Sequence, residues 1–206
     1  MDTVTSLDRY RAQREHRRRT ARRGTRLRFY FELASPYTYL SAERSERVFA
    51  ALDWIPVSSD ALQCAPLMTE DERDRVTRRA RLLGLPLVWP CGAPVSATGA
   101  MRVASLACER GVGGAFVLAA TRLVFCGGFD IDDPEILAEA AAAAGIDLVD
   151  MLEAAGDRRR DGAMDAAARR LLAAGVDRLP VLRVGPTLFC GEDRLPDAAA
   201  AARASA

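Results

Sequence analysis

The chain contains no lysine, only one histidine and no two cysteines close enough to form a C-x-x-C motif. The histidine, His16, lies near the N-terminus without a partner in sequence, which excludes a histidine-dependent triad from the core. Five cysteines are scattered along the chain, at Cys64, Cys91, Cys108, Cys126 and Cys190. Their number is odd and their spacing fits neither a redox motif nor a zinc knuckle, so we expect small, buried, reduced thiols.

Long apolar segments are also absent. No run approaches the roughly twenty apolar residues that span a bilayer, and no apolar signal segment opens the sequence. We therefore expect a cytoplasmic protein without membrane contact. The net charge of +1 gives no overall electrostatic argument for binding nucleic acid.

Residues 1–25 form a basic arm, with eight arginines against three acidic residues. A helix over this segment would be polar on nearly every face, so it would be a frayed solvated helix or disordered. The alternative is an arm that docks to an acidic partner, nucleic acid or a membrane surface. The solvated tail is the more common outcome for such a composition.

The most informative stretch is residues 27–40, LRFYFELASPYTYL. Apolar residues alternate at Leu27, Phe29, Phe31 and Leu33, which predicts a strand with one buried face. Serine is a preferred N-cap and proline suits the first helical position, so Ser35-Pro36 predicts a helix start. A strand would thus deliver a hydroxyl to a helix N-terminus, where a negative atom is favoured.

The rest of the chain predicts a mixed sheet interrupted by helices. A second strand is expected over residues 54–61, in a right-handed crossover parallel to the first. Helices are expected over 69–83, 98–110, 114–125, 134–144, 148–155, 157–174 and 195–204, and a hairpin over 181–190. This order predicts an α/β, thioredoxin-like fold with an inserted α-helical subdomain. We assign residues 26–64 and 175–206 to the thioredoxin-like domain and 65–174 to the helical insertion. Helix capping accounts for the aspartates at 130–133, so we expect no metal site.

Three segments carry a resemblance to a known family: FYFELASPYTYLSAER, DDPEILAEAAAAAGID and LPVLRVGPTLFCGEDRLPD. They resemble the 2-hydroxychromene-2-carboxylate isomerases and kappa-class glutathione transferases, a branch of the DsbA-like thioredoxin superfamily. The resemblance covers roughly residues 27–197. Its serine-proline-tyrosine opening and G-x-D-R close are distinctive in combination.

The resemblance implies roles for particular residues. Ser35 would stand where thioredoxins have their nucleophilic cysteine and would hydrogen-bond the sulfur of glutathione or another low-molecular-weight thiol. Leu179 and Pro180, a cis-proline before the third strand, would offer backbone groups to that cofactor. Pro36, Glu192 and Asp193 would complete cofactor binding, with Asp193 holding the γ-glutamyl amine.

The implied activity is a thiol-dependent cis–trans isomerisation of a small aromatic or conjugated substrate, in a protein that relatives indicate is a homodimer. Without a cysteine at the active position, disulfide exchange is excluded on chemical grounds. A kappa-class glutathione transferase is the nearest alternative, and a non-catalytic thioredoxin-like binding module is a further one. The chain departs from its relatives by lacking the lysine that contacts the cofactor's glycyl carboxylate. Arg73, Arg75, Arg78 or Arg79 could replace it.

Overall fold

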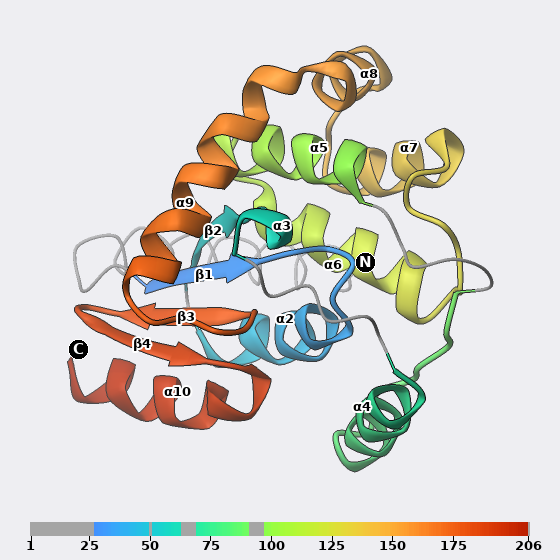
Figure 1. The fold of residues 1–206 in the computed structure, drawn as a ribbon. Coiled ribbons are helices and arrows are strands. Elements are labelled where there is room, and N and C mark those ends of the chain that lie inside the picture. The colour runs from blue at the N-terminus through green and yellow to red at the C-terminus, as the bar shows by residue number, and fades with distance from the viewer. Residues whose placement is uncertain (1–26, 50, 63–68, 91–96, 206) are drawn as a thin grey trace, which may run out of the picture.

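The computed structural model describes residues 27–49, 51–62, 69–90 and 97–205. Four strands form one mixed sheet in the order β2-β1-β3-β4 (Figure 1). The strands are β1 (Leu27–Phe31), β2 (Asp53–Pro56), β3 (Val181–Val184) and β4 (Thr187–Cys190). β1 pairs with β2 in parallel and with β3 antiparallel, and β3 and β4 form the expected hairpin. The basic arm lies outside the described residues.

Helices separate the two halves of this sheet in sequence, so the thioredoxin-like fold with a helical insertion is confirmed. The helices are α2 (Pro36–Val48), α3 (Ser59–Leu62), α4 (Glu70–Leu82), α5 (Thr98–Glu109), α6 (Gly113–Phe125), α7 (Pro134–Ala143), α8 (Leu148–Gly156), α9 (Asp161–Ala173) and α10 (Leu195–Ala204), with 3-10 turns η1 (Arg158–Arg160) and η2 (Glu192–Arg194). The exact domain boundaries proposed from the sequence stay a prediction.

The expected second strand is too long. β2 ends at Pro56, and residues 59–62 form α3 instead of continuing the strand. Pro56 still pairs with Phe31, and the Val57 amide donates to the Phe31 carbonyl at 2.9 Å, so the missing amide hydrogen of Pro56 lies on the unpaired side of this edge strand. The hydroxyl of Ser58 then accepts a hydrogen bond from the Ala61 amide at 3.4 Å, a local alternative to strand pairing.

Both faces of the sheet are buried, each by different helices. Phe29 and Phe31 of β1, together with Leu182 of β3, belong to the large core that includes residues of α2, α5 and α6. Tyr30 and Val181 point the other way, into a smaller cluster with α9 and the end of α3. This alternation confirms the period of two read from the sequence of β1.

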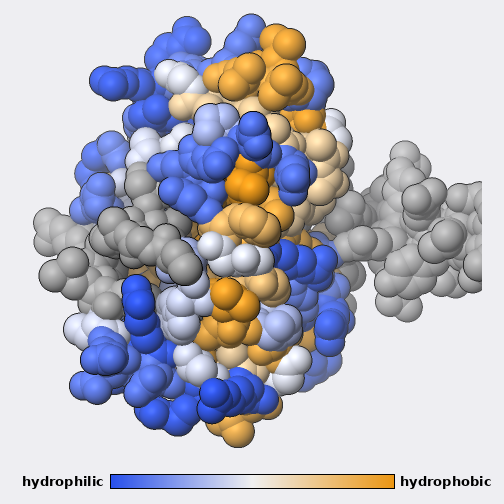
Figure 2. All heavy atoms as spheres, turned by 90° about the vertical axis from the view of Figure 1, so that its right-hand side faces the viewer, coloured by the Kyte–Doolittle hydropathy of each residue, from blue (hydrophilic) through white to orange (hydrophobic). Residues whose placement is uncertain are grey.

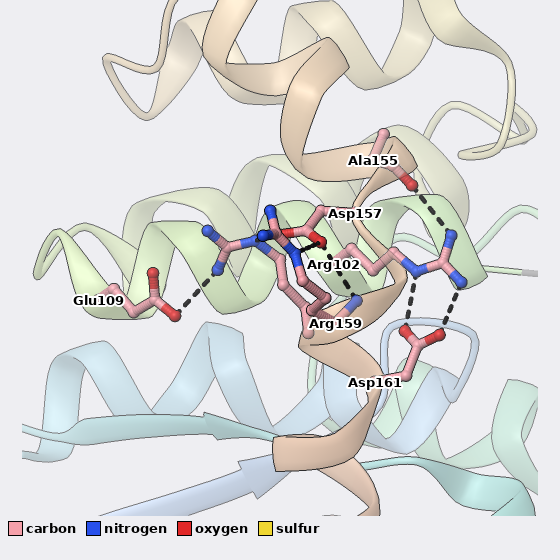
Figure 3. Close-up of polar contacts among 7 residues, drawn as sticks. Arg102, Glu109, Ala155, Asp157, Arg159 and Asp161 are labelled. Carbon is pink, nitrogen blue, oxygen red and sulfur yellow. Dashed lines mark hydrogen bonds and ion pairs between the residues drawn. The ribbon is translucent and has the colours of Figure 1, made fainter.

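Ion pairs between arginines and acidic residues connect the helices of the insertion to one another (Figure 3). Arg102 of α5 makes two hydrogen bonds to the carboxylate of Asp161, at 2.8 and 2.7 Å, and a third to the Ala155 carbonyl at 3.1 Å. The side chain of Arg102 is only 13% exposed. Two parallel charge-assisted bonds of this kind fix orientation as well as adding stability. Arg102 therefore joins α5 to the end of α8 and the start of α9.

We predict that Asp161→Asn lowers the free energy of unfolding by about 1 kcal/mol at pH 7, because one partner of the bidentate pair is lost and Asp161 is partly exposed. Hydrogen bonding to Arg102 lowers the pKa of Asp161. This contribution is therefore present above the unfolded pKa of about 4 and is lost as pH falls through the folded pKa. Urea unfolding at pH 7 and at strongly acidic pH checks it: the difference between wild type and variant should shrink in acid. A difference that persists there would contradict the ion-pair explanation.

Apolar side chains gather in a band on one face of the molecule (Figure 2). Large apolar residues that are substantially exposed include Leu82, Val88, Phe129, Leu148, Val149 and Leu152. Leu82 of α4 is 80% exposed and Val149 of α8 is 65% exposed. Contiguous exposed apolar surface often marks a contact site, but the homodimer stays a prediction. In the part of the chain that the structure describes, no helix has the length and apolarity to cross a membrane.

Candidate active site

Ser35 lies between β1 and α2, as the sequence predicts. Its backbone is extended, with φ −84° and ψ 119°, and Pro36 occupies the first turn of α2. The Ser35 carbonyl accepts a hydrogen bond from the Thr38 amide at 3.0 Å, but its hydroxyl makes no capping bond. Serine at this position usually caps with its hydroxyl. Here the hydroxyl remains available to another group, beside a helix N-terminus that favours negative charge and has no acidic side chain in its first turn.

Pro180 lies immediately before β3, and the peptide bond between Leu179 and Pro180 is cis. The cis-proline that the resemblance implied is therefore confirmed. Tyr30 of β1 pairs with Val181 of β3 in antiparallel register. The end of β1 and the residue before β3 must then lie at the same edge of the sheet. Ser35 follows β1 by a short turn, so the N-terminus of α2 and Pro180 are held at that edge (Figure 1).

Gly191 brings the C-terminal segment to the same edge. Its amide donates a hydrogen bond to the Pro180 carbonyl at 2.8 Å. Its φ of 97° is in the left-handed region, and a Cβ there would lie 2.6 Å from Oδ1 of Asp193. Only glycine meets both demands without strain. Asp193 itself is exposed in η2, two residues after Gly191, and its role toward a cofactor stays a prediction.

Glu192 is the buried acid of this region, with a side chain only 4% exposed. Its carboxylate forms one ion pair with Arg44 of α2, at 2.7 Å, and another with Arg79 of α4. Two positively charged arginines pair with one carboxylate, so the three side chains together carry a net positive charge. Sequence reasoning missed Arg44 altogether, and it named Arg79 only as one of four arginines that could contact a cofactor carboxylate. A direct part for Glu192 in cofactor binding stays a prediction.

α4 is joined to the start of α2 by a second polar contact. The hydroxyl of Tyr37 donates a hydrogen bond to Oε1 of Glu72 at 2.5 Å. Burial, followed by this bond to Glu72, raises the pKa of the Tyr37 hydroxyl well above its ordinary value, so Tyr37 is neutral near pH 7. Arg79 and Glu72 thus bring α4 beside the helix start that carries Ser35.

Glu32 is a titratable group near Ser35 that sequence reasoning did not select. It is partly buried at the end of β1, and its Oε1 accepts a hydrogen bond from the Ala34 amide at 2.8 Å. Burial raises the pKa of Glu32 to about 7, and the charge of Asp60 adds to that rise. The only feature of the sequence that could have identified Glu32 is an acidic residue among the apolar residues at the end of the predicted strand.

The described cysteines do not form a redox pair. Cys108, Cys126 and Cys190 are free thiols. Cys190 lies at the end of β4 near this edge, partly buried, and desolvation raises the pKa of its thiol. Burial raises the pKa of Cys108 to about 12. A raised pKa keeps a thiol protonated and therefore unreactive at neutral pH.

A family model for the DSBA-like thioredoxin domain matches residues 26–202. The chain belongs to the DsbA-like thioredoxin family. No functionally curated protein matches this member of the family. A fold family hosts more than one chemistry, so membership alone leaves the reaction open.

Solved structures of other proteins share the fold of this DsbA-like chain. One, a 2-hydroxychromene-2-carboxylate isomerase, superposes with a TM-score of 0.74 at 18% identity and covers 85% of this chain and 93% of its own. A Streptomyces coelicolor protein assigned as a DsbA oxidoreductase gives 0.67 at 19% identity, over 88% of this chain and 89% of its own. A Nitrosomonas europaea protein assigned as a protein disulfide isomerase gives 0.64 at 17% identity, over 85% and 95%. At these identities the likeness establishes the fold.

Proposed function

We propose that this DsbA-like protein is a glutathione-dependent, or more generally thiol-dependent, isomerase of small conjugated substrates. The observation that carries the proposal is the uncommitted hydroxyl of Ser35 at the N-terminus of α2, at the same sheet edge as the cis Leu179–Pro180 bond. A hydroxyl there can donate a hydrogen bond to a thiolate but cannot form a mixed disulfide. The fold shared with a 2-hydroxychromene-2-carboxylate isomerase supports the same choice.

In the proposed reaction the nucleophile is the bound thiol. Its thiolate adds to a conjugated double bond, the adduct rotates about the resulting single bond, and the thiol is expelled. Covalent addition divides one slow isomerisation into easier steps. Ser35 and the helix N-terminus stabilise the thiolate, and backbone groups beside Pro180 position the cofactor. Since the thiol must be reduced, a reducing compartment, the cytoplasm, remains the expected location.

A kappa-class glutathione transferase would use the same activated thiolate on a substrate with a leaving group or an epoxide. This second candidate differs only in the electrophile, so the same site supports it. It is distinguished by its product, a stable thioether in place of an isomerised substrate.

We predict that glutathione raises the melting temperature of the protein, because a ligand that binds only the native state stabilises it by about 2.7 kcal/mol at one hundred times its dissociation constant. Thermal unfolding with increasing glutathione measures this shift. It should be lost or strongly reduced in Ser35→Ala and retained in Cys190→Ala, the matched control at the same sheet edge. Conversion of 2-hydroxychromene-2-carboxylate in the presence of glutathione then tests the isomerase directly. No shift with glutathione or any other small thiol would favour a non-catalytic binding module.

A further inference from the structure

Glu32 lies in the turn that leads from β1 to Ser35. It directly follows β1, three residues before Ser35, and the chain turns between them so tightly that the Ser35 amide reaches the Glu32 carbonyl at 3.4 Å. The Glu32 side chain is directed into this turn, because its Oε1 accepts the Ala34 amide at 2.8 Å. The carboxyl group therefore lies in the connection that leads into α2.

Backbone amides, and no arginine, hold the Glu32 carboxylate in the described part of the chain. Its Oε1 accepts the Ala34 amide at 2.8 Å, and the Ser35 amide also stabilises the charged form. No arginine pairs with this carboxylate in the described part of the chain, whereas nine other described acids pair with an arginine. A carboxylate without a cation can take up a proton at little electrostatic penalty.

The surroundings of Glu32 bring its proton affinity close to neutral pH. Burial is the largest cause of its raised pKa, which is about 7, and the backbone amides of Ala34 and Ser35 oppose the rise. Asp60 of α3 is the charged group that faces Glu32 from a neighbouring element, and it raises the pKa further. A proton acceptor is most effective when its pKa lies near the working pH.

We propose that Glu32 is the general base that takes the proton from the thiol bound at Ser35. The S–H bond breaks, an O–H bond forms on the Glu32 carboxylate, and the electron pair stays on sulfur as the thiolate. When the thiol is expelled from the adduct and released, the proton returns to it. This inference rests on the proposed thiol-dependent function and assigns the step that the function leaves open.

The transfer solves an electrostatic problem at this site. A free thiol has a pKa of about 8.5 and is mostly protonated at neutral pH. A thiolate formed beside an ionised Glu32 would be repelled by it. Moving the proton from sulfur to Glu32 keeps the total charge of the pair at one negative unit and places it on sulfur, next to the amides of α2.

The thiolate's ultraviolet absorbance, measured as the difference between protein with and without saturating glutathione across pH, tests the proposal. Two coupled groups titrate in two steps. In wild type, part of the thiolate signal should appear near pH 7 and the rest at alkaline pH. Glu32→Gln keeps a carbonyl for the Ala34 amide but cannot accept a proton, so its signal should rise in one alkaline step. Asp60→Asn should move the first wild-type step toward acid.

Two results would overturn the general base. One is a single step at the same pH in wild type and Glu32→Gln. The other is a single step that moves toward acid in the variant, since Glu32 would then act only by repulsion. Failure of the proposed function is distinguishable, because it would be seen first as no glutathione-induced melting shift in wild type. Glu32→Gln should itself retain that shift, which shows that the variant folds and binds.

Discussion

Ser35→Ala is expected to lower kcat/KM for the glutathione-dependent reaction about 100-fold, the usual effect of removing one hydrogen bond that stabilises a developing negative charge. The same substitution should leave the free energy of unfolding almost unchanged, because the Ser35 hydroxyl makes no capping hydrogen bond. Activity and stability would therefore respond separately. Most N-cap serines behave in the opposite way, since their hydroxyl stabilises the helix.

Thr69→Ala provides the matched control for this prediction. Thr69 caps α4, and its hydroxyl oxygen accepts a hydrogen bond from the Glu72 amide at 3.2 Å. Removing that cap should lower the free energy of unfolding by about 1 kcal/mol with a much smaller effect on kcat/KM than Ser35→Ala. Steady-state kinetics and urea unfolding of both variants give the comparison. If Ser35→Ala were as destabilising as Thr69→Ala and fully active, Ser35 would be a structural cap and the proposed site would be wrong.

The sequence predicts β1, the start of α2 and the position of Ser35, because these features depend on residues that are close together in the chain. Alternating apolar residues specify β1, and Ser35-Pro36 marks the start of α2 after the short turn that follows β1. The hairpin and the insertion follow from turn and helix signals of the same local kind. The cis-proline at Pro180 came from the family resemblance, since most X–Pro bonds in folded proteins are trans.

Long-range contacts are the part that the sequence does not specify. Arg44 and Glu192 are 148 residues apart, and each looks like an ordinary surface charge in its own helix or turn. Only the antiparallel register of β1 and β3 brings η2 against α2. The predicted second strand is too long for a related reason: its end depends on tertiary contacts, since pairing with β1 stops at Pro56 and α3 packs against α9.

Glu192→Gln is the substitution with the largest expected effect on stability. The side chain is almost completely buried, and it pairs with Arg44 and Arg79, which are 21% and 33% exposed. Breaking a buried ion pair from one side typically lowers stability by about 3 to 5 kcal/mol. Because both arginines can regain some water, we expect a loss of about 2 to 3 kcal/mol here. Urea unfolding should show a lower midpoint. Hydrogen exchange should increase in α4, because α4 loses the ion pair between Arg79 and Glu192.

Two controls identify the cause of that loss. Asp197→Asn breaks an exposed pair with Arg194, whose side chains are 57% and 52% exposed, and should change stability by less than about 1 kcal/mol. Sulfate should stabilise Glu192→Gln more than it stabilises wild type, because an anion can take the place of the missing carboxylate between the two arginines. Equal responses to sulfate would mean that lost packing, and not the uncompensated charge of Arg44 and Arg79, destabilises the variant. A selective response would show that the edge carrying Ser35 holds an anion-binding pair that Glu192 normally fills.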